Sequence, residues 1–71
     1  MFKLLNEKEQ IDFIRKNEIK NKKLLEVFVN SPSWKVRNEI TNQKHLTEEM
    51  KSKLLKDKHY IVVESLINNL K

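Results

Sequence analysis

Apolar residues recur along this chain at the three- and four-residue spacing of amphipathic helices, with polar residues between them. The first predicted helix begins near Asn6, where Glu9 three residues on would complete a capping box. It ends at Asn17, and we expect that asparagine in the left-handed conformation. The second helix begins near Asn21 and ends at Asn30. Short polar turns separate the segments, so the pattern predicts helices throughout.

Three further helices follow, each introduced by a residue type that favours the N-terminal cap. Ser31 is the expected N-cap of the third helix, with Pro32 in the first turn, where its missing N–H costs no hydrogen bond. Thr47 is the expected N-cap of the fourth helix and Asp57 that of the fifth. The β-branched residues 61–63 would also suit a strand. We reject that strand because it would have no pairing partner.

The helix starts and the apolar positions recur together, without gaps, in a 26-residue register. A period between about 20 and 50 residues is typical of stacked helical units, none of which can bury its apolar side alone. We therefore expect paired residues, Trp34 and Tyr60 among them, to have like surroundings. The pairs are Asn21 with Thr47, Ser31 with Asp57, Leu24 with Met50, Phe28 with Leu54, Val29 with Leu55, Trp34 with Tyr60, Val36 with Val62, and Ile40 with Leu66.

Segments 31–37, 40–41, 46–50 and 54–57 also carry a resemblance to a known family. They read SPSWKVR, IT, LTEEM and LLKD. Over residues 17–71 the chain resembles the leucine-rich-repeat variant group of HEAT-like helical repeats, which share an Asp or Ser cap, a Val-Arg pair and a Leu-rich second helix. The resemblance implies an α-solenoid fragment that binds proteins and, less often, nucleic acid. The departures are Val63 for a recurring arginine, Thr41 and Ile67 for a small alanine, and Gln43 for an asparagine.

Together these features predict one all-α domain, a short right-handed helical repeat of the HEAT-like α-solenoid type with about five helices. A leading helix occupies residues 1–17, the first repeat residues 18–43 and the second repeat residues 44–71. Two alternatives remain open. The small domain could close by packing its first helix against its fifth, or the chain could be one protomer or piece of a longer array.

Composition narrows the class of protein. The chain has 71 residues, a net charge of +5, 38% hydrophobic residues and no cysteine. This length allows one domain with a small core, and its regularly placed apolar residues argue against disorder. Without cysteine there is no disulfide framework and no thiolate zinc site. No apolar run approaches the about 18 residues of a membrane span, so we expect a soluble cytoplasmic protein.

No catalytic arrangement is visible in the sequence. There is no cysteine nucleophile and no glycine-rich phosphate loop. His45 and His59 fall in turns with no third metal ligand nearby. Glu48 and Glu49 are adjacent and so point to different sides of a helix. We therefore expect a non-enzyme with no cofactor, no metal and no small-molecule substrate.

A protein-binding surface is expected on the third and fifth helices. Five apolar residues of the fifth helix form a stripe of about 140°, more than the about 100° that covers one neighbour. They are Val62, Val63, Leu66, Ile67 and Leu70, and Ile61 lies outside the stripe. A terminal helix of a solenoid should instead be polar. This predicts docking to another protein or to a second copy, as in a small adaptor or stoichiometric inhibitor. The expected binding residues are Trp34, Lys35, Arg37, Asn38, Tyr60, Ile61, Val63 and Ile67.

Three of these residues also have a structural interpretation, which we favour. Trp34 and Tyr60 are candidate interface hot spots, but both could anchor a turn by packing on the preceding helix. Arg37 could form an ion pair between repeats rather than touch a partner. Its candidate acids are Glu39, Glu64 and Asp57.

The alternative function is nonspecific nucleic-acid binding by a basic patch near the first turn, diluted by Glu18. Such binding needs cations gathered on one face to neutralise phosphates. We favour a solvated surface over this alternative. The patch residues are Arg15, Lys16, Lys20, Lys22 and Lys23. A second group, Lys51, Lys53, Lys56 and Lys58, is expected to scatter around the fourth helix.

Overall fold

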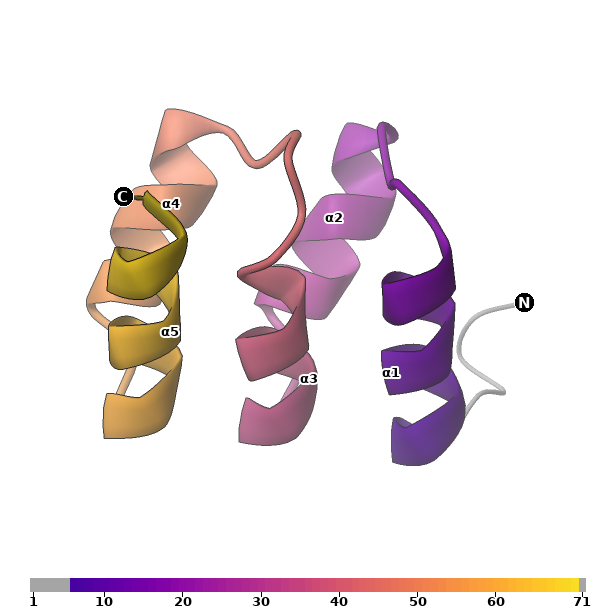
Figure 1. Ribbon diagram of the computed structural model, residues 1–71, viewed down its shortest axis with the longest axis horizontal. Helices are drawn as coiled ribbons and strands as arrows, with labels where there is room; N and C mark the ends of the chain where they lie inside the picture. Colours follow the sequence, from indigo (N-terminus) through magenta and orange to yellow (C-terminus); the bar gives the residue numbers. More distant parts are fainter. Residues whose placement is uncertain (1–5, 71) are drawn as a thin grey trace.

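The computed structural model describes residues 6–70, and it is all-helical there (Figure 1). None of these residues lies in a β-strand, and residues 61–63 are helical, as predicted. The five helices are α1 (Glu7–Lys16), α2 (Lys22–Val29), α3 (Trp34–Ile40), α4 (Glu48–Leu55) and α5 (Tyr60–Leu70).

Three of the predicted N-caps are confirmed. The side chains of Asn6, Asn21 and Thr47 each accept a hydrogen bond from the backbone N–H three residues on, at the starts of α1, α2 and α4. At α1 the Glu9 carboxylate also accepts from the Asn6 N–H at 3.0 Å, which completes the predicted capping box. These bonds satisfy N–H groups that have no partner within the helix.

The predicted caps of α3 and α5 are wrong by two or three residues. Ser33 is the N-cap of α3, and α5 begins only at Tyr60. The Ser31 hydroxyl accepts instead from the N–H of Ser33 at 3.1 Å, and the Asp57 carboxylate accepts from the N–H of His59 at 2.8 Å. Short polar side chains form such local turns in competition with capping. The two residues therefore do share a role, as turn formers just before a helix.

Asn17 and Asn30 follow the last residues of α1 and α2, as predicted, but the left-handed conformation expected of Asn17 is wrong. Asn17 is extended, at φ −134° and ψ 142°, and no residue within 6–70 has positive φ. Its side-chain amide donates to the carbonyl of Phe13 at 2.8 Å, and that of Asn30 donates to the carbonyl of Glu26 at 2.8 Å. Each side chain satisfies a carbonyl of the last turn, so the left-handed backbone is not needed.

The helices form two layers. α1, α3 and α5 lie side by side in one layer, with α2 and α4 behind them (Figure 1). α3 is central, because it contacts α1, α5 and α2. α1 and α5 lie at opposite ends of their layer with α3 between them, so the alternative in which the first helix closes against the fifth is wrong.

One core runs between the layers and contains three of the predicted pairs at matching burial. Each of these six side chains is at most 1% exposed. Burial of this completeness contributes about 1.5–3 kcal/mol per large apolar side chain, so these pairs supply a large share of the small core. They are Phe28 with Leu54, Val36 with Val62, and Ile40 with Leu66.

Candidate protein-binding surface

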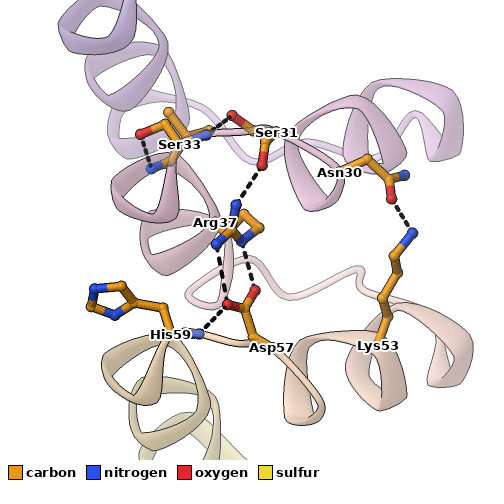
Figure 2. Close-up of polar contacts among 8 residues, drawn as sticks. Asn30, Ser31, Ser33, Arg37, Lys53, Asp57 and His59 are labelled. Carbon is orange, nitrogen blue, oxygen red and sulfur yellow. Dashed lines mark hydrogen bonds and ion pairs between the residues drawn. The ribbon is translucent and has the colours of Figure 1, made fainter.

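Arg37 joins α3 to the turn before α5 (Figure 2). Its Nε lies 2.6 Å from Oδ2 of Asp57 and its Nη2 lies 3.2 Å from Oδ1, while Nη1 donates to the carbonyl of Ser31 at 2.6 Å. The Arg37 and Asp57 side chains are only 17% and 7% exposed. The ion pair with Asp57 predicted as one alternative is confirmed, and the guanidinium is engaged within the fold.

The surroundings of Asp57 keep it ionised. Burial alone would raise the pKa of Asp57, but the hydrogen bonds from Arg37 and from the His59 N–H, together with the guanidinium charge, outweigh it. The pKa of Asp57 is therefore below its ordinary value. This bidentate pair is the strongest polar link between α3 and the turn that leads into α5.

Two side-chain amides tie the helices of the front layer together at their other end. Nε2 of Gln43 donates to the carbonyls of Ile14 and Asn17, both at 2.9 Å. Nδ2 of Asn69 lies 3.3 Å from the carbonyl oxygen and 3.2 Å from Oγ1 of Thr41. Gln43 and Asn69 are equivalent positions in the repeat register, and each binds the end of the helix that precedes its own in the layer.

Trp34 and Tyr60 do not have like surroundings, so that prediction is wrong. The Trp34 ring stacks on the His59 ring with centroids 4.0 Å apart and planes 9° apart. Tyr60 is 71% exposed, and its hydroxyl bonds to Glu64 at 2.7 Å. The interpretation that both aromatics anchor a turn by packing fails for Tyr60, because its side chain is exposed, whereas Trp34 is partly buried against the core.

Two exposed pairs each contain a carboxylate: Tyr60 with Glu64, and His45 with Glu18. The hydrogen bond with Glu64, followed by its charge, raises the pKa of Tyr60. The hydrogen bond from His45, at 2.5 Å, lowers the pKa of Glu18. The second pair links the turn between α1 and α2 to the turn between α3 and α4, so it is part of the fold.

At one end of the two layers, apolar side chains are exposed although their counterparts in the first repeat are covered. Val29 is 2% exposed and Leu55 is 41% exposed. Thr41 is 3% exposed and Ile67 is 44% exposed. α4 and α5 cover the first repeat, but no helix among the described residues covers the second. We call this surface the end face; it consists of Leu55, Tyr60, Val63, Ile67 and Leu70.

The end face is also less polar than the positions of the first repeat to which it corresponds. Solvent favours polar side chains, yet Ile67 is exposed where Thr41 is buried, and the exposed Leu70 corresponds to a lysine that is also exposed. Exposed large apolar side chains of this kind are typical of an interaction site. The residues that change are Arg37, Thr41 and Lys44, which correspond to Val63, Ile67 and Leu70.

The structure divides the eight predicted binding residues into two sets. Trp34, Arg37 and Asn38 belong to α3; Trp34 and Arg37 contact the turn before α5, and Oδ1 of Asn38 is buried without a hydrogen-bond partner. These three are half-buried within the fold. The remaining five are exposed or half-buried, and all but Lys35 belong to α5: Lys35, Tyr60, Ile61, Val63 and Ile67.

Sequence reasoning missed Leu55 and Leu70 as surface residues. The repeat register already paired Leu55 with Val29. That register identifies equivalent positions, but it does not say which of them has a neighbour to cover it. The signal that could have identified Leu55 as exposed is its place in the second repeat, which no further predicted repeat covers.

The basic patch near the first turn carries charges of both signs. Nε of Arg15 lies 3.1 Å from Oε1 of Glu39, and Glu18 lies within the same stretch of chain. The four lysines of the patch are exposed. The interleaved acids weaken the positive field that phosphate binding requires. These lysines are Lys16, Lys20, Lys22 and Lys23.

The second lysine group is less scattered than predicted. Lys53, Lys56 and Lys58 line one recess of about 310 Å³ beside the Arg37–Asp57 pair. Nζ of Lys53 donates to the side-chain oxygen of Asn30 (Figure 2). α2 and α4 both end at this recess, and lysines stabilise the negative ends of helices. The arrangement is explained by the fold.

Within residues 6–70, no three His, Asp or Glu side chains gather as a metal ion would require. α5, with 11 residues, is the longest helix of that range, and none of the helices there has the length and apolar character to cross a membrane.

Comparisons of this chain with known protein families, with curated proteins and with solved structures find no match. The resemblance to HEAT-like repeats therefore stays a prediction, and the case for a function is made from the surface itself.

Proposed function

We propose that this protein is a small non-catalytic protein–protein interaction module that binds its partner through the end face. The observation that supports this is that exposed positions of the second repeat are apolar where the first repeat has polar residues. Ile67 is exposed where Thr41 is buried, and the exposed Leu70 corresponds to the exposed Lys44. The fold of the described residues does not require apolar side chains at Ile67 and Leu70. A partner that covers these two positions would explain why they are apolar. Such a module suits an adaptor, an inhibitor or a self-associating subunit.

The same proposal includes the finer fold, a right-handed HEAT-like solenoid with a leading helix before two repeats. Its support is the recurrence of specific hydrogen bonds. Ser31 and Asp57 form the same turn, and Gln43 and Asn69 form corresponding ties to the preceding helix. In a solenoid, an end face is where the next unit or a partner would dock. The cytoplasmic location remains a prediction of composition.

Residues on α5 allow a matched test of the end face. Ile67 and Ile61 are 44% and 41% exposed on the same helix, but about 120° apart around it, so only Ile67 belongs to the end face. Ile67→Glu places a charge in the proposed contact, and Ile61→Glu places the same charge outside it. Circular dichroism should show both variants folded, because neither side chain is in the core.

The binding experiment compares proteins from the native host retained by the immobilised wild type and by each variant. We expect at least one protein to be bound by the wild type and by Ile61→Glu but lost with Ile67→Glu. If Ile67→Glu retains the same proteins as Ile61→Glu, the end face is not the binding surface and the proposal is wrong.

A further inference from the structure

We infer that the partner of the end face is a second copy of this chain, bound through α5 in an antiparallel pair. This inference rests on the proposed function. One stripe of α5 has the spacing three, four, three, which is the seam of a coiled coil. Its residues are exposed except for Val63, which is half-buried. The stripe covers about 80° of the helix, on the side away from α3. The stripe consists of Tyr60, Val63, Ile67 and Leu70.

This stripe matches itself when a second α5 runs in the opposite direction. The four positions are symmetric about residue 65, so Tyr60 would lie opposite the second copy's Leu70, and Val63 opposite its Ile67. A two-fold dimer requires this property, because the same patch must complement itself. The large side chains would meet at the two ends and the β-branched ones at the centre.

Charge also favours α5 as the meeting point of two copies. The chain carries a net charge of +5, so two copies repel each other over most of their surfaces. α5 is the exception, because Glu64 is the only charged residue among its 11. Glu64 lies at the edge of the stripe, where its carboxylate accepts a hydrogen bond from the hydroxyl of Tyr60. An acidic partner would find no basic side chain on this helix.

Head-to-tail stacking of copies fits the end face less well. Within the chain, the covering unit brings Asp57 to Arg37, and that ion pair fixes how α3 and α5 meet. At the end face Val63 occupies the position that corresponds to Arg37. In head-to-tail stacking, the Asp57 of the next copy would be desolvated at this position without a cation to pair with. A symmetric apolar seam is therefore the better fit.

The size of the seam sets the expected strength. α5 is about 16 Å long, and a contact of this length buries less than the about 800 Å² per partner of stable complexes. We therefore expect a weak dimer in rapid exchange with the monomer. Its population should rise with concentration in sedimentation equilibrium.

Sedimentation equilibrium of the full chain tests self-association directly. The wild type and Ile61→Glu should rise from 8.6 kDa toward twice that mass as concentration increases. Ile67→Glu should dimerise at least about tenfold more weakly, which corresponds to the loss of one well-buried contact. A wild type that stays at 8.6 kDa at the highest concentration overturns the inference, and so does growth beyond the dimer, which indicates head-to-tail stacking.

Disulfide trapping tests the antiparallel arrangement, and the chain has no cysteine that would interfere. Tyr60→Cys and Leu70→Cys are mixed and oxidised in the presence of a redox buffer. We expect the mixed disulfide to predominate, because like positions would be about 15 Å apart along the axis. Predominance of like-with-like disulfides would show a parallel pair and overturn this geometry.

These results separate the inference from the proposed function. If the wild type is strictly monomeric and Ile67→Glu loses a host partner, the inference of a second copy is refuted. The proposed function as an interaction module then still stands. A dimer unaffected by Ile67→Glu would show that two copies do not meet at the end face and would refute the inference. The proposed function fails only if Ile67→Glu also retains the same host proteins as Ile61→Glu.

Discussion

Trp34 and Tyr60 occupy the same position at the starts of α3 and α5, and they differ in what covers them. The turn that leads into α5 places His59 against the Trp34 ring at 4.0 Å, whereas Tyr60 is 71% exposed. The local pattern determines that each aromatic begins a helix. Its place in the row of helices determines whether it is buried. The following predictions test the links along that row and the surface at its end.

The first prediction concerns the Arg37–Asp57 pair. Asp57→Asn leaves the guanidinium of Arg37 without its anion in a mostly buried setting, which should lower the free energy of unfolding by about 3 kcal/mol. For a chain of this size that is a large share of the total, since stability is about 0.05–0.15 kcal/mol per residue. Chemical denaturation followed by circular dichroism measures the change.

The same pair predicts a dependence on pH. The pKa of Asp57 is lower in the folded than in the unfolded chain, so the unfolded chain binds the proton more readily. The contribution of the pair is therefore complete above the ordinary value of 3.8 and is lost as the pH falls through the lower folded value. The stability difference between wild type and Asp57→Asn should shrink as pH falls below about 4. A difference that stays constant down to low pH would contradict this account.

The second prediction concerns Gln43, whose amide binds three backbone groups. Besides its two donor bonds, its Oε1 accepts from the N–H of Ile19 at 2.8 Å. Gln43→Ala should cost about 2 kcal/mol, because it leaves part-buried backbone groups unpaired. Asn42→Ala is the control, since Asn42 is exposed and makes one bond of 3.3 Å within its own turn. Equal losses in the two variants would show that Gln43 does not tie α3 to α1.

The sequence was sufficient for the helices and the core, and insufficient for the surface. Periodicity and short-range capping at Asn6, Asn21 and Thr47 depend on neighbouring residues, so they can be read locally. The caps of α3 and α5 were misplaced because Ser31 and Asp57 can form either a cap or a turn, and the position of Arg37 favours the turn.

Exposure was harder to predict because it depends on neighbours in space. The register showed that Val29 and Leu55 are equivalent, but α4 covers only the first of them. The partial burial of Trp34, Arg37 and Asn38 could not be predicted for the same reason, since the sequence does not show that α5 and the turn before it lie against α3.

The third prediction concerns the hydroxyl of Tyr60. Its hydrogen bond to the Glu64 carboxylate raises its pKa, because the phenolate would lose that bond and face a like charge. Glu64→Gln should therefore lower the pKa of Tyr60 toward its ordinary value. Tyr60 is the only tyrosine in the chain, so a spectrophotometric titration of tyrosinate reports on it alone. An unchanged titration would show that the two side chains do not pair in solution.

The fourth prediction concerns nucleic acid. If the exposed lysines near the first turn bound phosphates, affinity would fall steeply with salt and would weaken in Lys20→Gln/Lys22→Gln/Lys23→Gln. Because Glu18 and Glu39 interrupt the positive charge, we expect no gel-shift binding of double-stranded DNA even at low salt. Binding that is strong at low salt and lost in the triple variant would favour the alternative function instead.

The last prediction concerns what the end face contributes to folding. Ile67→Thr/Leu70→Lys gives the second repeat the residues that the first repeat has at Thr41 and Lys44. Since neither side chain is buried, the free energy of unfolding of the monomer should change by no more than about 0.5 kcal/mol per substitution. Val62→Thr, at a fully buried position of the same helix, should cost about 2 kcal/mol because it buries a hydroxyl among apolar groups. If the surface pair destabilises the monomer as much as Val62→Thr does, the end face serves the fold and not a partner.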